Sequence, residues 1–437
     1  MKRTGASTCT PADMTVADMV RAVTTPPLPV RITAYDGSAV GPRSSGLELR
    51  VVSPQAFSYM ATAPGELGLA RAYIMGKIAM RGVAPGNPYK AFDRLEQLRE
   101  RVRRPSVGDL GRILIALGRN GIRRPEIPDV ETPPAWRRAL SGMRTHTQES
   151  DKDTVSSHYD RSNRFYSMVL GPLMTYTCAL FTDPEDSLED AQANKIRLVL
   201  DKLDLSAGQR LLDIGCGWGS VLVAAARRGI RAIGVTLSEP QAHWANEWIA
   251  REGLSDLAEA RVMDYRRVPE RDFDGICSLG MMEHVGVRHY DEYFSTMFSL
   301  LRPGGRLLNH QITRRDSTQP NHAGAFIGRY VFPDGELAAP GAVMSRLHDA
   351  GFEVVHEENL RQHYALTLEN WCRNLQEHWS AAVESAGSQT SLLWGLYMAG
   401  ARWNFERNSI QIHQLLAVRP GPDRDGHWYP LRPWWNA

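Results

Sequence analysis

Arg210-Leu-Leu-Asp-Ile-Gly-Cys-Gly-Trp-Gly-Ser220 is the stretch of this chain that decides its fold. A short apolar run that ends in closely spaced glycines predicts a buried strand that turns tightly into a helix. Glycine permits such a turn and lets a ligand approach the backbone, and the N-terminus of the following helix attracts negative charge. The stretch therefore predicts the first strand of a ligand-binding α/β domain, over residues 210–214.

The sequence after this stretch alternates between helical and strand patterns. Helices are predicted at residues 220–228 and 241–252, with a strand at 232–236 between them. Alternation of this kind is typical of βαβ units, in which helices cover both faces of a parallel sheet. We therefore expect an open, doubly wound, Rossmann-like α/β sheet. Its further predicted strands are residues 260–263, 275–279 and 305–310.

The glycine spacing narrows the class of ligand. The three glycines follow the pattern G-x-G-x-G, which is shorter than the dinucleotide pattern G-x-G-x-x-G. Asp213 lies two residues before the first glycine, and its carboxylate suits a pyrophosphate poorly. The pattern favours a compact nucleoside that carries a carboxylate, S-adenosylmethionine.

The composition is that of a globular protein. Of the 437 residues, 43% are hydrophobic and 23% are charged, and the formal net charge is +2, which excludes disordered, collagen-like and coiled-coil chains. No apolar run approaches the roughly 18 residues of a membrane-spanning helix, and the first residues lack the apolar core of a secretory signal. The five cysteines are odd in number and contain no C-x-x-C pair, which predicts free thiols and no metal site. We expect a cytoplasmic protein.

The chain before residue 146 does not show this regular alternation of helical and strand patterns. We predict a mobile tail over residues 1–27 and a small α+β domain with a proline-rich linker over residues 28–145. The predicted elements of that domain are a β-hairpin of strands 30–35 and 47–52 about the turn Asp36-Gly37, and a helix over residues 66–80.

A basic stretch lies within that domain. Residues 94–144 hold 12 arginines against six acids, a local net charge of +6, which favours an anionic surface. Within the stretch, Leu110, Ile113, Leu114 and Leu117 recur at helical spacing, beside Arg112 and Arg119. This is the pattern of an amphipathic helix that lies on a membrane interface, although leucines at this spacing also suit packing against the protein's own core.

The chain carries several motifs in a fixed order. They are His158-Tyr-Asp160, Thr175-Tyr-Thr-Cys-Ala179, Asp213-Ile-Gly-Cys-Gly-Trp-Gly219, Gly234-Val-Thr-Leu-Ser238 with Gln241, Asp264-Tyr-Arg266 and Gly280-Met-Met-Glu-His-Val-Gly286. Together they resemble the cyclopropane fatty acid synthase family of S-adenosylmethionine-dependent lipid methyltransferases. The resemblance covers nearly the whole chain after residue 28. It implies a class I methyltransferase domain over residues 146–437 and a lipid-binding or dimerisation role for residues 28–145.

The resemblance also implies which residues bind the cofactor. The methionine part would be lined by Gly215 and Gly217, with Tyr176 and Thr177 near its carboxylate. Tyr265 would lie against the adenine. The full predicted set is Tyr159, Tyr176, Thr177, Asp213, Gly215, Gly217, Thr236, Leu237, Gln241, Asp264 and Tyr265. Ordinary strand packing is the alternative for Thr236 and Leu237, and turn formation is the alternative for the glycines.

Methyl transfer from a sulfonium to an unactivated carbon–carbon double bond leaves a carbocation, which must be shielded from water and then lose a proton. The resemblance implies that a bicarbonate ion accepts this proton. Glu283 and His310 would orient the ion with the backbone of Ile312, and Cys178 and Tyr364 would close its pocket. Cys178 as a small buried residue and His310 as a core histidine are the structural alternatives.

Two products are compatible with this chemistry. The cation gives a cyclopropane if it closes on the new methyl group, and a 10-methylene branch if a hydride shift precedes proton loss. The segment Thr147-Gln-Glu-Ser-Asp-Lys-Asp-Thr-Val-Ser-Ser157 is acidic, where cyclopropane synthases usually carry basic residues. This resembles the actinobacterial branch that makes 10-methylene chains, which a separate flavin-dependent reductase then saturates. The cyclopropane is the alternative product.

The resemblance implies an unsaturated (oleoyl) membrane phospholipid as substrate, a homodimer, and a peripheral position on the inner leaflet of the plasma membrane. The basic stretch and the cofactor motif would also suit a nucleic-acid methyltransferase, but the Pro-Cys and Asn-Pro-Pro-Tyr signatures of base methylation are absent, so no nucleic-acid partner is expected. A non-catalytic lipid-binding scaffold is a further interpretation, and the retained Glu283 and His310 argue against it.

Overall fold

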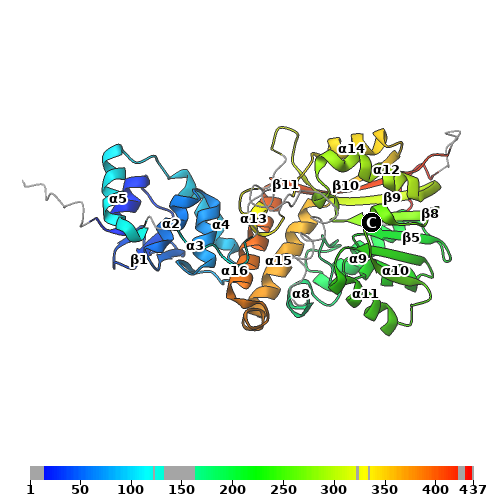
Figure 1. Ribbon diagram of the computed structural model, residues 1–437, viewed down its shortest axis with the longest axis horizontal. Helices are drawn as coiled ribbons and strands as arrows, with labels where there is room; N and C mark the ends of the chain where they lie inside the picture. The colour runs from blue at the N-terminus through cyan, green and yellow to red at the C-terminus, as the bar shows by residue number, and fades with distance from the viewer. Residues whose placement is uncertain are drawn as a thin grey trace, which may run out of the picture. The chain divides into compact units, whose positions relative to one another are not determined.

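The computed structural model describes residues 14–121, 124–131, 163–320, 324–332, 335–421 and 429–435. Contacts divide the chain into two compact units, one of residues 1–131 with 387–400 and one of residues 132–386 with 401–437 (Figure 1). The predicted domain boundary between residues 145 and 146 lies outside the described residues, as does the acidic segment 147–157.

The larger unit is built on a seven-stranded sheet of order β10-β11-β9-β8-β5-β6-β7. The five strands from β9 to β7 run parallel, whereas β11 is antiparallel to both of its neighbours. This confirms the predicted doubly wound α/β fold, and each of the five predicted strands overlaps an observed one. The strands are β5 (Arg210–Ile214), β6 (Arg231–Thr236), β7 (Ala258–Val262), β8 (Phe273–Leu279), β9 (Leu301–Arg314), β10 (Glu353–Asn359) and β11 (Ile410–Val418).

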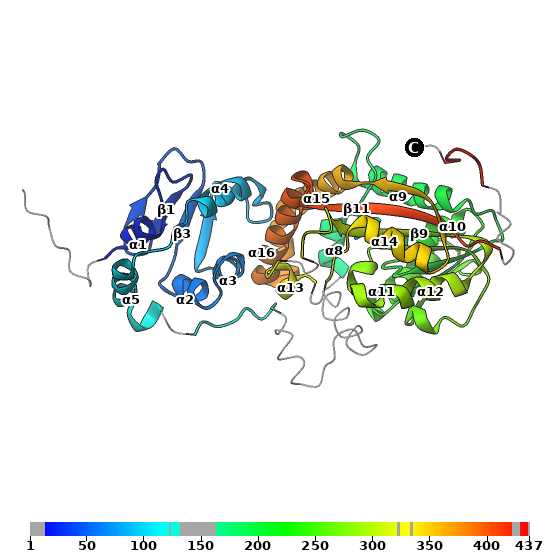
Figure 2. The same ribbon diagram turned by 90° about the horizontal axis from the view of Figure 1, so that it is seen from above.

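Helices cover both faces of this sheet, and each face buries its own apolar core. Successive strand residues point to opposite faces, so Leu211 and Leu308 join one core while Leu212 and Leu307 join the other. The first face is covered by α9 (Leu188–Leu203), α10 (Ser220–Arg227) and α11 (Glu239–Arg251), and the second by α12 (Tyr290–Leu300) and α14 (Pro340–Asp349). Figure 2 views the unit from the side of α12 and α14. The other helices of this unit are α8 (Asn163–Leu170), α13 (Ile327–Tyr330) and α15 (Arg361–Glu377).

The smaller unit contains a four-stranded sheet of order β2-β1-β3-β4. Its strands are β1 (Arg31–Ala34), β2 (Ala39–Val40), β3 (Glu48–Val51) and β4 (Ile78–Arg81), and its helices are α1 (Val16–Val23), α2 (Gln55–Thr62), α3 (Glu66–Ile74), α4 (Tyr89–Glu100) and α5 (Val107–Gly121).

Two predicted elements of this unit are wrong in detail. The turn at Asp36-Gly37 joins β1 to the short strand β2, whereas β1 and β3 pair in parallel. The helix predicted over residues 66–80 ends at Ile74, because Gly76 takes a φ of +66° and the chain continues as the edge strand β4. Alternating apolar residues identified the strands but not their partners.

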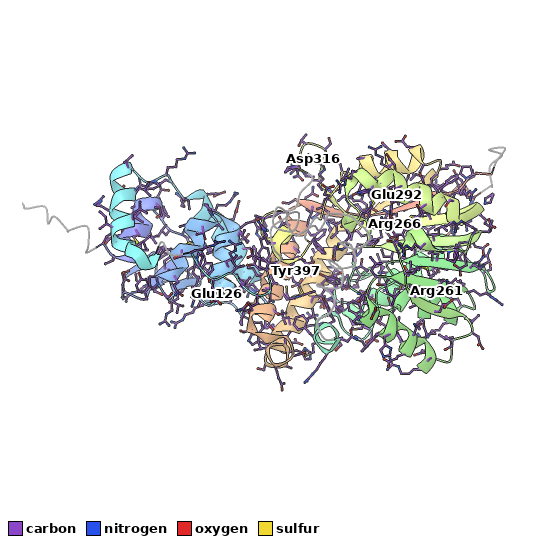
Figure 3. All side chains as sticks on the ribbon, viewed as in Figure 1. Glu126, Arg261, Arg266, Glu292, Asp316 and Tyr397 are labelled. Carbon is purple, nitrogen blue, oxygen red and sulfur yellow. The ribbon has the colours of Figure 1, made fainter. Side chains whose placement is uncertain are left out.

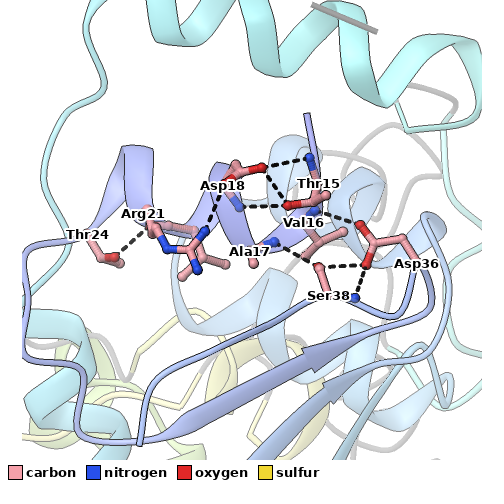
Figure 4. Close-up of polar contacts among 9 residues, drawn as sticks. Thr15, Val16, Ala17, Asp18, Arg21, Thr24, Asp36 and Ser38 are labelled. Atoms are coloured by element: carbon pink, nitrogen blue, oxygen red, sulfur yellow. Dashed lines mark hydrogen bonds and ion pairs between the residues drawn. The ribbon is translucent and has the colours of Figure 1, made fainter. Parts of the chain in front are cut away.

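The mobile tail predicted over residues 1–27 is also wrong where the structure describes it. Helix α1 begins with a capping box, in which Thr15 and Asp18 exchange hydrogen bonds (Figure 4). The carboxylate of Asp36 accepts from the backbone N–H of Val16 at 2.8 Å, and the Ser38 hydroxyl accepts from that of Ala17 at 3.0 Å. These contacts fix the helix to the β1–β2 hairpin and satisfy its first N–H groups.

Helix α16 (Trp379–Glu406) contains a break at Gly387, where φ is +82°. Its residues 387–400 belong to the smaller unit, which the sequence analysis did not predict. Gly395 lies against the chain at Pro85, whose carbonyl oxygen would be 2.4 Å from a Cβ at that position. The close approach explains why glycine occupies position 395.

No helix among the described residues is both long enough and apolar enough to cross a membrane. Cys178, Cys216, Cys277 and Cys372 are free thiols, and all four are buried.

Candidate active site

The carboxyl ends of the central strands meet at one cavity. β5 lies between β6 and β8, and residues that follow all three strands line the cavity. This is the switch point at which open α/β sheets bind ligands. Gly217 and Gly219 both have positive φ. A Cβ on Gly217 would meet no atom within 4 Å, whereas a Cβ on Gly219 would lie 2.7 Å from the Cβ of Ala245. Gly217 therefore leaves the cavity wall open, and Gly219 lets α10 pack against α11.

The structure brings the predicted cofactor residues together around this cavity, apart from Tyr159, which lies outside the described residues. The ten that line it are Tyr176, Thr177, Asp213, Gly215, Gly217, Thr236, Leu237, Gln241, Asp264 and Tyr265. They come from segments up to 89 positions apart in the chain. Their binding role stays a prediction.

Polar contacts order the two loops that follow strands β6 and β7. The Thr236 hydroxyl donates to Oε1 of Gln241 at 2.9 Å and accepts from the backbone N–H of Ser238 at 3.2 Å. The Asp264 carboxylate is held by Arg266, which Figure 3 labels, with an Nη2 to Oδ2 distance of 2.6 Å. The Arg266 hydrogen bonds help keep the pKa of Asp264 below its usual value, although burial alone would raise it. These bonds hold the cavity-lining residues of both loops in place.

Tyr265 forms an aromatic wall next to these polar groups. Its side chain is buried, and its ring contacts that of Tyr293 edge to face, with 5.5 Å between centroids. The Tyr293 hydroxyl in turn donates to Ser278 at 2.7 Å. A fixed aromatic ring beside hydroxyl and amide groups suits an adenosine.

Asp213, at the end of β5, marks the other part of the cavity. It is buried, and Oδ1 accepts from the thiol of Cys277 at 3.3 Å. Burial raises the pKa of Asp213 to about 6. A buried carboxylate gains from a cationic partner, so this end suits the ammonium of an amino acid.

A second, smaller cavity adjoins the first, because Tyr176, Thr177, Gly280 and His284 line both. Three of the predicted catalytic residues line it, namely Glu283, Ile312 and Tyr364. Its remaining lining residues are Phe332 and Ile412.

Glu283 lies in a short 3-10 turn (Met282–His284) directly after β8. Its Oε1 accepts from the backbone N–H of Ile312 at 2.6 Å, while Oε2 is buried and has no hydrogen-bond partner among the described residues. Burial raises the pKa of Glu283 to about 7, and the bond from Ile312 opposes that rise. A carboxyl group with a pKa near neutrality is suited to general acid–base work.

Cys178 and His310 do not line this cavity. The Cys178 thiol donates to the carbonyls of Ala179 at 3.1 Å and Leu360 at 3.7 Å, and burial raises its pKa. His310 is completely buried on β9, where neither ring nitrogen has a hydrogen-bond partner among the described residues. Burial lowers the pKa of His310 well below its usual value, so the ring is neutral.

Lys195 is the cavity residue that the sequence analysis most clearly missed. It lies on α9 with its side chain completely buried. Its position in the sequence was the available signal. Lys195 lies three residues after Gln192 and four before Val199, so the helical spacing places it on the buried, largely apolar face of α9.

Comparison with known proteins gives a consistent result. Residues 146–415 match the family described as mycolic acid cyclopropane synthetase. The chain is 50% identical over 410 residues to a probable fatty acid methyltransferase of Mycobacterium tuberculosis, covering 93% of this chain and 95% of that protein. It is 35% identical over 407 residues to a probable fatty acid methyltransferase of Pseudomonas putida, covering 92% and 94%.

Two solved structures of cyclopropane synthases are similar to this chain. The cyclopropane synthase MmaA2 from Mycobacterium tuberculosis is 31% identical, with a TM-score of 0.58, and the match covers 61% of this chain and 98% of that one. The mycolic acid cyclopropane synthase CmaA1, complexed with SAH and CTAB, is 30% identical with the same TM-score and coverage.

Proposed function

The chain belongs to the mycolic acid cyclopropane synthetase family, and on that premise we propose its substrate, product and proton acceptor. It is an S-adenosylmethionine-dependent methyltransferase that acts on lipids. The substrate is the cis double bond of an unsaturated, oleoyl-type phospholipid acyl chain, and the product is a 10-methylene-branched chain.

The observation that supports this proposal most strongly is the position of Glu283. Its carboxyl group lies in the cavity that adjoins the cofactor cavity, with Oε1 fixed by Ile312 and Oε2 unpartnered in the described structure. The reaction needs a proton acceptor beside the transferred methyl group, and it needs that acceptor shielded from water. Glu283 lies where it can orient such an acceptor in a site closed to water.

The reaction proceeds in three steps. The electron pair of the double bond attacks the methyl carbon as its bond to sulfur breaks, which leaves S-adenosylhomocysteine and a cation at carbon 9. A hydride then moves from carbon 10 to carbon 9. The methyl group on carbon 10 loses a proton, and the electrons of that C–H bond form the exocyclic double bond.

The bicarbonate ion is proposed for the smaller cavity, where Glu283 Oε2 is a buried polar atom without a partner among the described residues. Both ring nitrogens of His310 also lack partners among these residues, but His310 does not line the cavity. Glu283 and Tyr364 would hold the ion in the smaller cavity. The backbone N–H of Ile312 already donates to Glu283, and the Cys178 thiol already donates to two carbonyls. When bound, bicarbonate supplies a proton acceptor. Glu283 is protonated in part near neutral pH, which lets it bind an anion without full charge repulsion.

The alternative product is a 9,10-methylene ring, formed if the cation closes on the methyl group without the hydride shift. The acidic segment before residue 158 favours the methylene branch by resemblance. A flavin-dependent reductase would then act on the product. The two products are isomers, so their identity must come from their reactivity rather than their mass.

In this proposal, helix α5 binds the enzyme to the membrane surface, where the substrate lies. On this helix Ile113 and Leu117 are partly buried, but Val107, Leu110, Leu114 and Ile115 are exposed. Six of the ten exposed large hydrophobic residues in the described structure lie within residues 102–127. Exposed arginines such as Arg101 and Arg104 lie just before the helix. An apolar face beside arginines suits the interface of an anionic bilayer.

Expression of this chain alone in a host that makes oleoyl phospholipids tests the proposal. The fatty acids would be examined by mass spectrometry before and after hydrogenation. A new C19 acid that takes up hydrogen and carries its branch at carbon 10 is expected. A saturated ring at carbons 9 and 10 would favour the alternative product, and the absence of any C19 acid would contradict lipid methylation.

A further inference from the structure

Helix α9 buries two lysines whose surroundings differ. Lys202 and Lys195 are both completely inaccessible to solvent. The Lys202 ammonium pairs with Oε2 of Glu358 at 2.5 Å and donates to Oε1 of Gln414 at 2.7 Å. Nζ of Lys195 has no hydrogen-bond partner among the described residues. A buried ammonium without a partner is strongly unfavourable, so Lys195 lacks a group that the cavity beside it can supply.

Lys195 contributes to the wall of the larger cavity, together with Thr175, Tyr176 and Thr177. One turn earlier on α9, Nε2 of Gln192 donates to the carbonyls of Leu170 at 2.9 Å and Thr175 at 3.4 Å. These bonds attach the helix to the segment that forms the same wall. The Lys195 ammonium is therefore held at the cavity by a rigid element.

The ionisable groups that influence Lys195 are the Asp213 carboxyl and the thiols of Cys178 and Cys277. Burial raises the pKa of both thiols and keeps them neutral, and none of the three groups is within hydrogen-bond distance of Nζ. Burial lowers the pKa of Lys195 to about 8, a shift that these three groups oppose. The Asp213 carboxylate is partnered by Cys277. The Lys195 charge therefore remains available to a ligand.

We propose that Lys195 binds the α-carboxylate of the cofactor's methionine part and so fixes the direction in which that part enters the cavity. This rests on the proposed function and deepens it. S-adenosylmethionine carries two cations, its ammonium and its sulfonium, and one anion, its carboxylate. Lys195 repels the two cations and attracts the carboxylate, while Asp213 attracts the ammonium. The two buried residues together select one orientation of the zwitterion.

The test compares two ligands and two variants by isothermal titration calorimetry on the full chain. S-adenosylhomocysteine has the carboxylate, and 5′-methylthioadenosine lacks the whole amino acid end. Lys195→Met removes the charge and keeps a similar volume. Lys202→Met is the matched control, because it removes the other buried lysine of α9, which is partnered outside the cavity.

Lys195→Met is expected to weaken S-adenosylhomocysteine binding at least tenfold and to leave methylthioadenosine binding within twofold of wild type. Lys202→Met is expected to change neither affinity by more than twofold. If the role of Lys195 were purely structural, Lys195→Met would weaken the binding of both ligands. That result, or an unchanged affinity for S-adenosylhomocysteine, would overturn the proposal.

A second measurement needs no variant and applies if Lys195→Met does not fold. The wild-type chain is titrated with the α-carboxamide of S-adenosylhomocysteine, which keeps the shape and removes the negative charge. At least tenfold weaker binding is expected, and equal affinity would overturn the role of Lys195. If neither S-adenosylhomocysteine nor methylthioadenosine binds the wild-type chain, the proposed cofactor itself is contradicted.

Discussion

The carboxylate of Glu283 accepts a hydrogen bond from the backbone N–H of Ile312 at 2.6 Å, across the ends of two adjacent parallel strands, β8 and β9. The bond fixes one carboxylate oxygen and leaves the other without a partner in the described structure. Because neither oxygen forms an ion pair within the described part of the chain, the group is available for a charge that arises only during the reaction.

Glu283→Gln should fold and bind cofactor but lose turnover. The amide keeps the shape of the side chain but lacks the charge that is needed when the cation forms, so kcat should fall by about 100-fold or more. The dissociation constant for S-adenosylhomocysteine should change by less than about twofold. Glu270→Gln is the control, because Glu270 pairs with Arg261 at 2.7 Å away from both cavities. Wild-type turnover in Glu283→Gln would refute the assignment.

The same substitution should change how stability depends on pH. The folded-state pKa of Glu283 is about 7, above its usual value of 4.5, so the folded state retains a proton that the unfolded state releases. Stability attributable to this group is therefore greatest below about pH 4.5 and falls as the pH rises to 7. Glu283→Gln should gain stability relative to wild type over that interval, by up to about 3 kcal/mol.

Urea denaturation of both proteins at pH 5 and pH 8 measures this difference. Glu270→Gln provides a contrast of sign, because the Arg261 hydrogen bond helps keep the pKa of Glu270 below its usual value. Its carboxylate stabilises the fold above the unfolded-state pKa. The stability of Glu270→Gln relative to wild type should therefore not increase between pH 5 and pH 8. A stability difference for Glu283→Gln that is the same at both pH values would be inconsistent with a buried, neutralised carboxyl group.

Gly219→Ala should destabilise the larger unit more than Gly253→Ala. Both glycines have positive φ, and each substitution therefore incurs about 1 kcal/mol of backbone strain. At position 219 the new Cβ would also lie 2.7 Å from the Cβ of Ala245, whereas at 253 no atom lies within 4 Å. Overpacking between two helices adds about 1–3 kcal/mol. Denaturation midpoints that shift equally in the two variants would contradict the proposed helix contact.

Substitutions on α5 should weaken membrane binding without affecting the cofactor site. Replacing Leu110, Leu114 and Ile115 by Ser removes exposed apolar contacts and should reduce cosedimentation with phosphatidylglycerol vesicles at any salt concentration. Replacing Arg101 and Arg104 by Gln should reduce binding at low salt only, since Debye screening weakens those charges. Val262→Ser, an exposed residue of the other unit, is the control. Equal binding of all these proteins would contradict the role of α5.

The sequence predicted the part of the fold that rests on local signals. β5 was predicted at its observed bounds, because an apolar run and a glycine turn define a buried strand without reference to the rest of the chain. The capping box of Thr15 and Asp18 is an equally local signal, and it marks the start of a helix inside the predicted mobile tail.

Other features depend on contacts between distant residues, which a single sequence does not reveal. The parallel pairing of β1 with β3 and the inclusion of residues 387–400 in the smaller unit are of this kind. In the site, Glu283 and the glycines were found from their motifs, whereas Lys195 stands in no motif. Its proposed role rests on the fold, which leaves it buried at a cavity with no hydrogen-bond partner among the described residues.

The central claim is that the enzyme methylates an acyl double bond and then removes a proton from the transferred methyl group. Its most direct test incubates the purified chain with dioleoyl phosphatidylglycerol vesicles and S-adenosylmethionine that carries three deuterium atoms on its methyl group. A C19 acid that retains two of the three deuterium atoms and takes up hydrogen on reduction is the predicted result. A C19 acid that retains all three, or no C19 acid, would contradict the account.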